Sequence, residues 1–292
     1  MINEELKNVL KIFVSDAVII GAGGIILLLF RVLGDPYKRG FFCDDDSLKY
    51  PFHDSTVTSA MLYGIGFVLA VIVMVVVESV LIYKCVNSQL KTDLKTYGHL
   101  KIIVRNIYIS LVPFLFGAVI EHIVTDIGKY SIGRLRPHFF DVCKVNFSKI
   151  NCSQGHIEDF ECLGKEANEI REMRLSFPSG HASFSTYVAV YLVIYIQKHV
   201  TFFRRYLFRS VVQALLIYLA WYTCLSRITD YKHHPSDVIA GAVIGSTTAA
   251  LVAYCVSDMF PCMSSHDLNQ STVSDGSVEQ QCHNEAQQLH DL

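Results

Sequence analysis

Between Leu111 and Pro137 the sequence reads LVPFLFGAVIEHIVTDIGKYSIGRLRP. The first half ends an apolar run that starts near Ile103, and about 20 such residues are enough for a helix to cross a membrane. The second half places Lys129 and Arg136 directly after that run. A charge beside the membrane is costly unless it is functional, paired or extended to the lipid headgroups. The stretch therefore predicts a membrane helix that ends in a polar site.

Six stretches of the chain are long and apolar enough to be such helices. Of the 292 residues, 51% are hydrophobic and 18% are charged, against roughly 25% charged in soluble proteins. The predicted spans are 12–31, 58–83, 103–127, 182–197, 211–226 and 237–256. The fourth is the least hydrophobic and is rich in Tyr. We therefore expect an all-α polytopic membrane protein with six transmembrane helices, forming one domain over residues 1–262.

The loops predict the orientation of these helices. An even number of spans puts both termini on one side, and the basic loops 84–102 and 198–210 favour the cytoplasm for that side. The polar segment 263–292 is then a disordered cytoplasmic tail. The long third loop, 128–181, and the fifth loop are then exterior or lumenal.

The third loop contains features typical of that face. Asn146-Phe-Ser and Asn151-Cys-Ser are acceptor sequences for N-linked glycans. Four cysteines also fall in exterior loops, where disulfides persist. Four cysteines allow three pairings, and the sequence does not choose among them. They are Cys43, Cys143, Cys152 and Cys162.

Two further polar segments fall on the same face as Lys129 and Arg136. One reads PSGH and ends at His181; the other runs from Ser226 to Asp237 and reads SRITDYKHHPSD. The second adds Arg227, a third cation. Arginine forks match phosphate oxygens and lysine adds a point charge, so the three cations favour a phosphate site over single residues that only reach for headgroups.

The PSGH segment begins the fourth predicted helix. Ser179 is a good helix cap, and Gly180 lets a ligand approach the backbone amides, which favour anions at a helix start. An ordinary cap is the alternative. His181 beside this anion site is a candidate acid or base.

If the sixth helix begins at His233, its spacing of four residues from Asp237 puts the two on one face. Pro235 suits the first turn of a helix and weighs against a helix that already runs from His233. A carboxylate bound to one imidazole nitrogen would leave the other free to attack. His234 is the competing nucleophile, and a solvated surface pair is the alternative. The sequence has no HExxH, paired CxxC or dense carboxylate cluster, so we predict no metal and no cofactor.

The pattern Lys-x6-Arg-Pro, Pro-Ser-Gly-His and Ser-Arg-x5-His-x3-Asp resembles the signature of the type 2 phosphatidic acid phosphatases. The flanking residues, over about 10–260, look like those of the animal lipid phosphate phosphatases, also called phospholipid phosphatases. The resemblance implies an integral membrane phosphoric monoester hydrolase. Its substrates would be phosphatidate, lysophosphatidate, ceramide-1-phosphate or sphingosine-1-phosphate, and it would not need Mg²⁺.

The resemblance also implies a role for each signature residue. His233 forms a phosphohistidine, Asp237 orients it, and His181 protonates the leaving alkoxide. The phosphate oxygens are held by Lys129, Arg136, Ser179, Gly180 and Arg227. A phosphatase of the same superfamily acting on a non-lipid ester, or a six-span transporter or scaffold, is the alternative.

The expected partners follow from this reading. They are the lipid phosphate and the bilayer, and we expect no nucleic acid. The sequence does not decide between a monomer and a homo-oligomer. We expect the plasma membrane, with internal membranes as the alternative and the active site exterior or lumenal.

Overall fold

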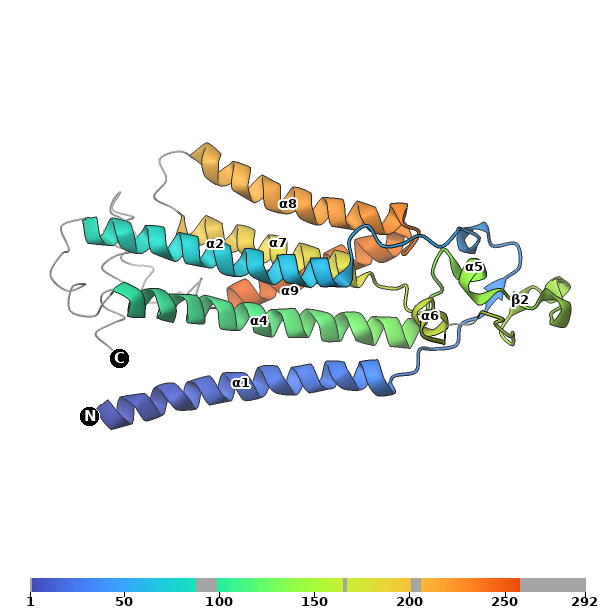
Figure 1. Cartoon of the computed structure of the whole chain (residues 1–292), viewed down its shortest axis with the longest axis horizontal. Helices are drawn as coiled ribbons and strands as arrows, with labels where there is room; N and C mark the ends of the chain where they lie inside the picture. The colour runs from blue at the N-terminus through green and yellow to red at the C-terminus, as the bar shows by residue number, and fades with distance from the viewer. Residues whose placement is uncertain (1, 88–98, 165–166, 201–205, 258–292) are drawn as a thin grey trace, which may run out of the picture.

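The computed structural model describes residues 2–87, 99–164, 167–200 and 206–257. Its long helices run side by side, and the connections between helices that the structure describes in full gather at one end (Figure 1). Each long helix coincides with one predicted span, so the all-α fold is confirmed. The predicted tail, 263–292, lies outside the described residues. The long helices are α1 (Ile2–Leu33), α2 (Ser59–Asn87), α4 (His99–Ile132), α7 (Gly180–His199), α8 (Tyr206–Thr229) and α9 (Pro235–Cys255).

Five of these helices are long and apolar enough to cross a membrane, and α7 is the exception among those described. Buried tyrosines lower its hydropathy. Tyr187 and Tyr191 donate hydrogen bonds to the carbonyls of Phe114 and Ser110, and Tyr195 donates to the Glu78 carboxylate. A helix surrounded by other helices can carry polar groups that a lipid-facing helix cannot. The count of six membrane spans stays a prediction.

Helix α7 occupies the centre of the bundle and packs against α2, α4, α8 and α9. Its closest neighbour is α9, where Gly245 makes the approach possible. A Cβ added at Gly245 would collide with the carbonyl oxygen of Ser183. This tight packing fixes the N-terminal ends of α7 and α9 side by side, and both ends carry predicted site residues.

A small cap covers the end of the bundle that carries the polar segments. It contains α5 (Phe139–Cys143), α6 (Ala167–Glu172), three short 3₁₀ turns and a two-stranded antiparallel sheet of β1 (Phe41–Phe42) and β2 (His156–Ile157). Phe41 and Phe139 are almost fully buried in its separate apolar core. The cap lies beyond the ends of the long helices (Figure 1).

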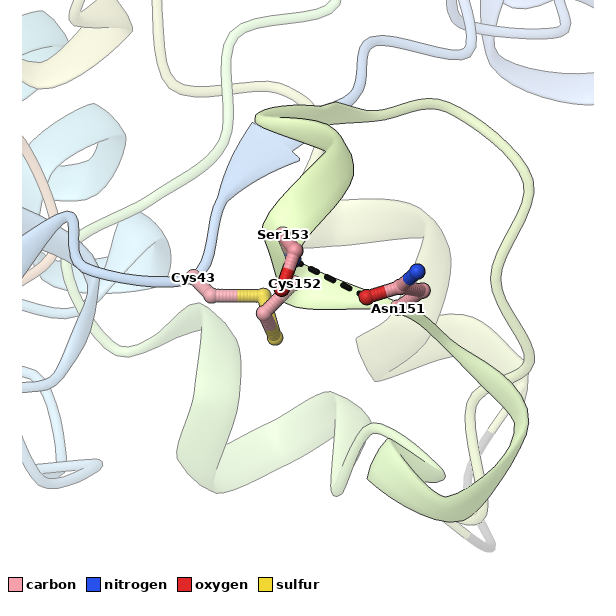
Figure 2. The surroundings of a disulfide bond; sticks show 4 residues. All are labelled: Cys43, Asn151, Cys152 and Ser153. Carbon is pink, nitrogen blue, oxygen red and sulfur yellow. Dashed lines mark hydrogen bonds between the residues drawn. A yellow bond between two sulfur atoms is a disulfide. The ribbon is translucent and has the colours of Figure 1, made fainter.

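Two disulfides tie the cap together. Cys43 pairs with Cys152, and Cys143 pairs with Cys162, so one of the three open pairings is selected. The first bond joins the loop before α2 to the loop after α4, and Figure 2 shows it next to Asn151. The Asn151 side-chain oxygen accepts a hydrogen bond from the Ser153 amide at 3.0 Å. The first predicted glycosylation site, Asn146, lies in the same part of the cap.

Candidate functional site

A sharp turn after α4 brings the first basic segment back over the bundle. Helix α4 ends at Ile132, and Gly133 follows with a φ of 59° while its amide bonds to the Lys129 carbonyl. Only glycine adopts this conformation without strain, and a Cβ here would also meet the Tyr37 carbonyl. The turn keeps Lys129 on the helix and sends Arg136 across its end.

Six of the eight predicted catalytic and phosphate-binding residues line one pocket at this end of the bundle. Its volume is about 190 Å³. The walls come from five of the long helices, from α6 and from the loops between them, so the pocket forms only when the bundle is assembled. The six residues are Lys129, Arg136, Gly180, His181, Arg227 and His233.

The cations of the pocket are held by acidic partners. Arg136 pairs with Glu172 at 2.9 Å. Arg227 is 1% exposed and pairs with Asp230 at 2.8 Å, while both carboxylate oxygens of Asp230 accept hydrogen bonds from Thr56. These partners fix the guanidinium groups before any ligand binds, and such preorganisation favours anion binding.

His233 lies outside the final helix, in the turn that precedes α9. It is 5% exposed, and its Nδ1 lies 2.7 Å from the backbone carbonyl of Ser176. A carbonyl only accepts, so Nδ1 carries the proton and Nε2 keeps its lone pair. Burial, with the charges of Arg136 and Lys129, lowers the pKa of His233 well below its usual range. The imidazole is therefore neutral at neutral pH, as a nucleophile requires.

The Asp237 carboxylate lies close to His233 without bonding to it. The distance from His233 Nδ1 to Asp237 Oδ2 is 4.0 Å, which is too long for a hydrogen bond. Because α9 begins at Pro235, the two residues do not share a helix, contrary to the spacing argument. Asp237 instead accepts hydrogen bonds from the Ser176 hydroxyl, the His234 amide and Arg134. It thus positions Ser176, and the Ser176 carbonyl positions His233.

His181 lines the pocket from the first turn of α7. Its Nε2 lies 3.1 Å from the carbonyl oxygen of Val57, in the segment before α2. Because a carbonyl only accepts hydrogen bonds, Nε2 carries a proton and donates a hydrogen bond to Val57. Nδ1 is then the nitrogen that can exchange a proton with a ligand.

Ser179 and Gly180 differ in their exposure to the pocket. Ser179 is fully buried, and its hydroxyl caps α7 by accepting from the Ala182 amide at 3.4 Å. Its predicted contact with a phosphate oxygen stays a prediction. Gly180 does line the pocket, and a Cβ there would lie 3.1 Å from Lys129 Nζ. The missing side chain keeps that cation accessible.

Sequence reasoning missed several residues of the pocket. Lys232 lines it beside His233, with its Nζ 3.5 Å from the ring centroid of Phe52. Burial, with the charge of Arg136, lowers the pKa of Lys232 to about 8. Its position directly before His233 in the sequence could have identified it as a pocket residue. The other lining residues that were missed are Arg31, Ser55, Ser59, Tyr63 and Glu172.

The fold and the site together define a polytopic helical membrane protein with a cationic, two-histidine pocket at one end of its bundle. Comparison with known proteins gives the family. The model of the PAP2 superfamily matches residues 110–260, which include all three polar segments. This chain belongs to the PAP2 superfamily, as its signature predicted.

Relatives with names match most of the chain. It is 41% identical over 254 residues to phospholipid phosphatase 1 of Rattus norvegicus, covering 87% of this chain and 88% of the relative. It is 38% identical over 232 residues to phospholipid phosphatase 2 of Homo sapiens, covering 80% and 78%. A Drosophila melanogaster protein, whose name assigns it provisionally to the phosphatidate phosphatases, is 45% identical over 263 residues, covering 84% and 68%.

These relatives confirm the predicted enzyme class, a phosphoric monoester hydrolase. No solved structure matches the chain.

Proposed function

We propose that this protein is an integral membrane lipid phosphatase that works through a phosphohistidine and needs no Mg²⁺. The observation that carries the proposal is one pocket holding His233, His181 and the cations Lys129, Arg136 and Arg227 at the end of a membrane-type bundle. The names of the relatives support a lipid phosphate as the substrate. The candidates are phosphatidate, lysophosphatidate, ceramide-1-phosphate and sphingosine-1-phosphate.

The proposed reaction has two steps. In the first, Nε2 of His233 attacks phosphorus, the bond from phosphorus to the lipid oxygen breaks, and His181 gives its proton to the departing alkoxide. In the second, neutral His181 takes a proton from water, the oxygen of that water attacks phosphorus, and the P–N bond breaks to release phosphate. Lys129, Arg136 and Arg227 stabilise the charge on the phosphoryl oxygens in both steps.

Phosphate release from a panel of lipid phosphates in detergent micelles tests this function. Activity should persist in EDTA, because the proposed electrostatic stabilisation comes from side chains rather than from a divalent ion. Vanadate should inhibit, because it adopts the five-coordinate shape of the transferring phosphoryl group and binds where that state is stabilised. A full loss of activity in EDTA that Mg²⁺ restores would contradict the mechanism. Release from soluble sugar phosphates alone would point to a non-lipid substrate.

Loss of the proton on Lys232 should lower the activity of the enzyme on the basic side of its pH profile. With a pKa of about 8, its charge is present below that pH and is lost as the pH rises through it. The value of kcat/KM should therefore fall above pH 8. Lys232→Arg should remove this fall, because a guanidinium stays charged, while Lys232→Met should lower kcat/KM at pH 7 by about tenfold or more.

The pH profile of kcat/KM for the three proteins checks this. Lys149→Arg is the matched control, since Lys149 is exposed on the cap and distant in sequence from the pocket residues. If kcat/KM of Lys232→Arg still fell above pH 8, a group other than Lys232 would be responsible for the fall.

We propose an exterior or lumenal active site, in the plasma membrane, with glycans on Asn146 and Asn151. Two disulfides and both acceptor sequences in the cap support this side. Changing both asparagines to Gln should remove all N-linked sugar, measured as the loss of the mobility shift on glycosidase treatment. A third acceptor sequence, Asn269-Gln-Ser, lies in the predicted cytoplasmic tail. A glycan on Asn269 would place the tail on the exterior face and contradict this orientation.

A further inference from the structure

A second polar pocket, of about 210 Å³, lies at the cap, and we call it the cap pocket. Its walls come from the loop around β1, from β2, and from two segments that also supply the histidine pocket. Arg134 and His234 line the cap pocket, whereas Arg136 and His233 line the histidine pocket. No residue of the described chain lines both, so the two are separate cavities that share these segments.

The cap pocket carries more positive than negative charge. Arg39 and Arg134 are its arginines, and Asp45 is the one acid among its described lining residues. His234 adds no charge at neutral pH, because burial, with the charge of Arg134, lowers the pKa of its imidazole. A concave polar surface with an excess of positive charge attracts anions.

Both arginines keep hydrogen-bond donors free for a ligand. Within the described ranges, the Arg39 guanidinium has no hydrogen bond or ion pair. Arg134 uses Nη1, which donates to the Ser236 hydroxyl at 2.7 Å and to the Asp237 carboxylate. Its Nη2 and Nε have no partner in that part of the chain. Guanidinium groups bind phosphate oxygens through paired N–H donors, so the two arginines suit a phosphate group.

Asp45 gives the cap pocket a preference between anions. Its Oδ1 accepts hydrogen bonds from the amide and the hydroxyl of Ser47, at 3.0 and 2.6 Å, which fixes the carboxylate. Hydrogen phosphate carries a proton that it can donate to a carboxylate, whereas sulfate carries none at neutral pH and is repelled. The pocket therefore suits hydrogen phosphate better than sulfate.

The position of the cap favours an anion from the water phase. The cap lies beyond the ends of the long helices (Figure 1), and Arg39 and His156 are exposed. Free phosphate and a lipid headgroup offer the same phosphate chemistry. A headgroup is tied to the bilayer around the long helices, so free phosphate is the expected ligand.

A series of contacts links the cap pocket to His233. Arg134 bonds to the Asp237 carboxylate, which accepts from the Ser176 hydroxyl at 2.6 Å. The Ser176 carbonyl in turn holds Nδ1 of His233 at 2.7 Å. An anion on Arg134 competes with Asp237 for the guanidinium. Weaker pairing lets the Asp237 carboxylate move, and the groups that hold His233 move with it.

We propose that the cap pocket is a second anion site, which binds free phosphate between Arg39, Arg134 and Asp45 and slows the chemical step at His233. The binding does not depend on the proposed function, and only the effect on turnover rests on it. Phosphate is the product of the proposed reaction, so the product would slow the enzyme without competing for the histidine pocket. Poorer alignment of the nucleophile lowers kcat rather than raising KM.

Protection of arginines from phenylglyoxal tests the binding without turnover. The full-length protein in detergent micelles is labelled with and without free phosphate, and peptide mass spectrometry gives the labelling rate at each arginine. At ten times its dissociation constant, phosphate should slow labelling of Arg39 about tenfold. Arg31, which lines the histidine pocket, reports on that pocket in the same sample. A phosphonate analogue of phosphatidate should protect Arg31 and leave Arg39 reactive.

Three results would contradict this assignment. Protection of Arg31 alone by free phosphate would confine binding to the histidine pocket. Protection of Arg39 by the phosphonate would assign the cap pocket to a lipid headgroup. Equal protection of Arg39 by sulfate and by phosphate would show an unselective cationic surface. In Asp45→Asn, by contrast, sulfate should protect Arg39, because the amide can donate a hydrogen bond to it.

Inhibition by phosphate tests the effect on turnover. With nitrophenyl phosphate as substrate, phosphate in the histidine pocket raises KM and phosphate in the cap pocket lowers kcat. Arg39→Gln should abolish the fall in kcat and keep the rise in KM, because Arg39 lines the cap pocket alone. Lys38→Gln is the matched control, since Lys38 is exposed, carries the same charge and lines neither pocket. It should keep both effects.

The outcomes separate this inference from the proposed function. If the unaltered protein cleaves no phosphate ester, the proposed function fails and the effect on turnover fails with it, while protection of Arg39 still decides the site. If phosphate raises KM but leaves kcat unchanged in the unaltered enzyme, the link to His233 is wrong. A fall in kcat that persists in Arg39→Gln would also overturn that link.

Discussion

Alanine in place of His233 should abolish phosphate release from both a lipid phosphate and nitrophenyl phosphate. The buried, neutral imidazole has its Nδ1 proton committed to the Ser176 carbonyl, so Nε2 is free to attack. Without it no covalent intermediate forms. Removal of a nucleophile commonly costs at least about 10⁴-fold, so activity should fall to the background of both assays.

His234→Ala is the matched control for this experiment. The His234 ring is also buried, but His234 does not line the pocket. Its Nε2 lies 3.0 Å from the Leu135 carbonyl and donates a hydrogen bond to it. The variant should lose stability and keep the chemistry. The unaltered enzyme should also yield, after alkaline quench, a phosphorylated peptide that contains both histidines, and fragmentation of that peptide should place the phosphate on His233. Near-normal turnover in His233→Ala, with loss in His234→Ala, would exchange the two assignments.

The pocket could be predicted from the sequence because its residues adjoin the apolar runs. Lys129 ends one helix, His181 begins another, and Arg227 lies in the last turn of a third. Helix ends on one face of a membrane bundle must lie near each other, so parity alone brings these side chains together. The same logic found all six long helices, including α7, whose tyrosines make it less hydrophobic.

The supporting contacts could not be predicted, because they depend on backbone paths between helices. The carbonyl of Ser176 holds His233, and the carboxylate of Asp237 holds Ser176 and Arg134. A spacing of four residues suggested a direct pair of His233 and Asp237, but the turn before Pro235 breaks the helix on which that argument rested. The disulfide pairing was undetermined for a similar reason, since it follows from how the cap folds.

His181→Ala should lose far more activity on a lipid phosphate than on nitrophenyl phosphate. A lipid alkoxide is strongly basic and must be protonated as it leaves, whereas nitrophenolate leaves without help. General acid catalysis contributes about 10²–10⁴-fold, so the lipid reaction should slow by this factor and the aryl reaction by much less. Burial, with the charges of Arg227 and Lys129, lowers the pKa of His181 to about 3 in the empty pocket. The acid role therefore requires that a bound phosphate dianion offset those charges and favour the protonated imidazole.

Arg136→Ala is the control variant against which the two losses of His181→Ala are compared. Arg136 holds phosphate oxygens in either substrate, so its loss should lower kcat/KM for both by similar factors. If His181→Ala also lowered both equally, His181 would be a phosphate-holding residue rather than a proton donor. Both substrates present the same dianion to the three cations and differ in the basicity of the oxygen that leaves. The ratio of the two losses therefore measures proton transfer alone, which a loss on one substrate cannot do.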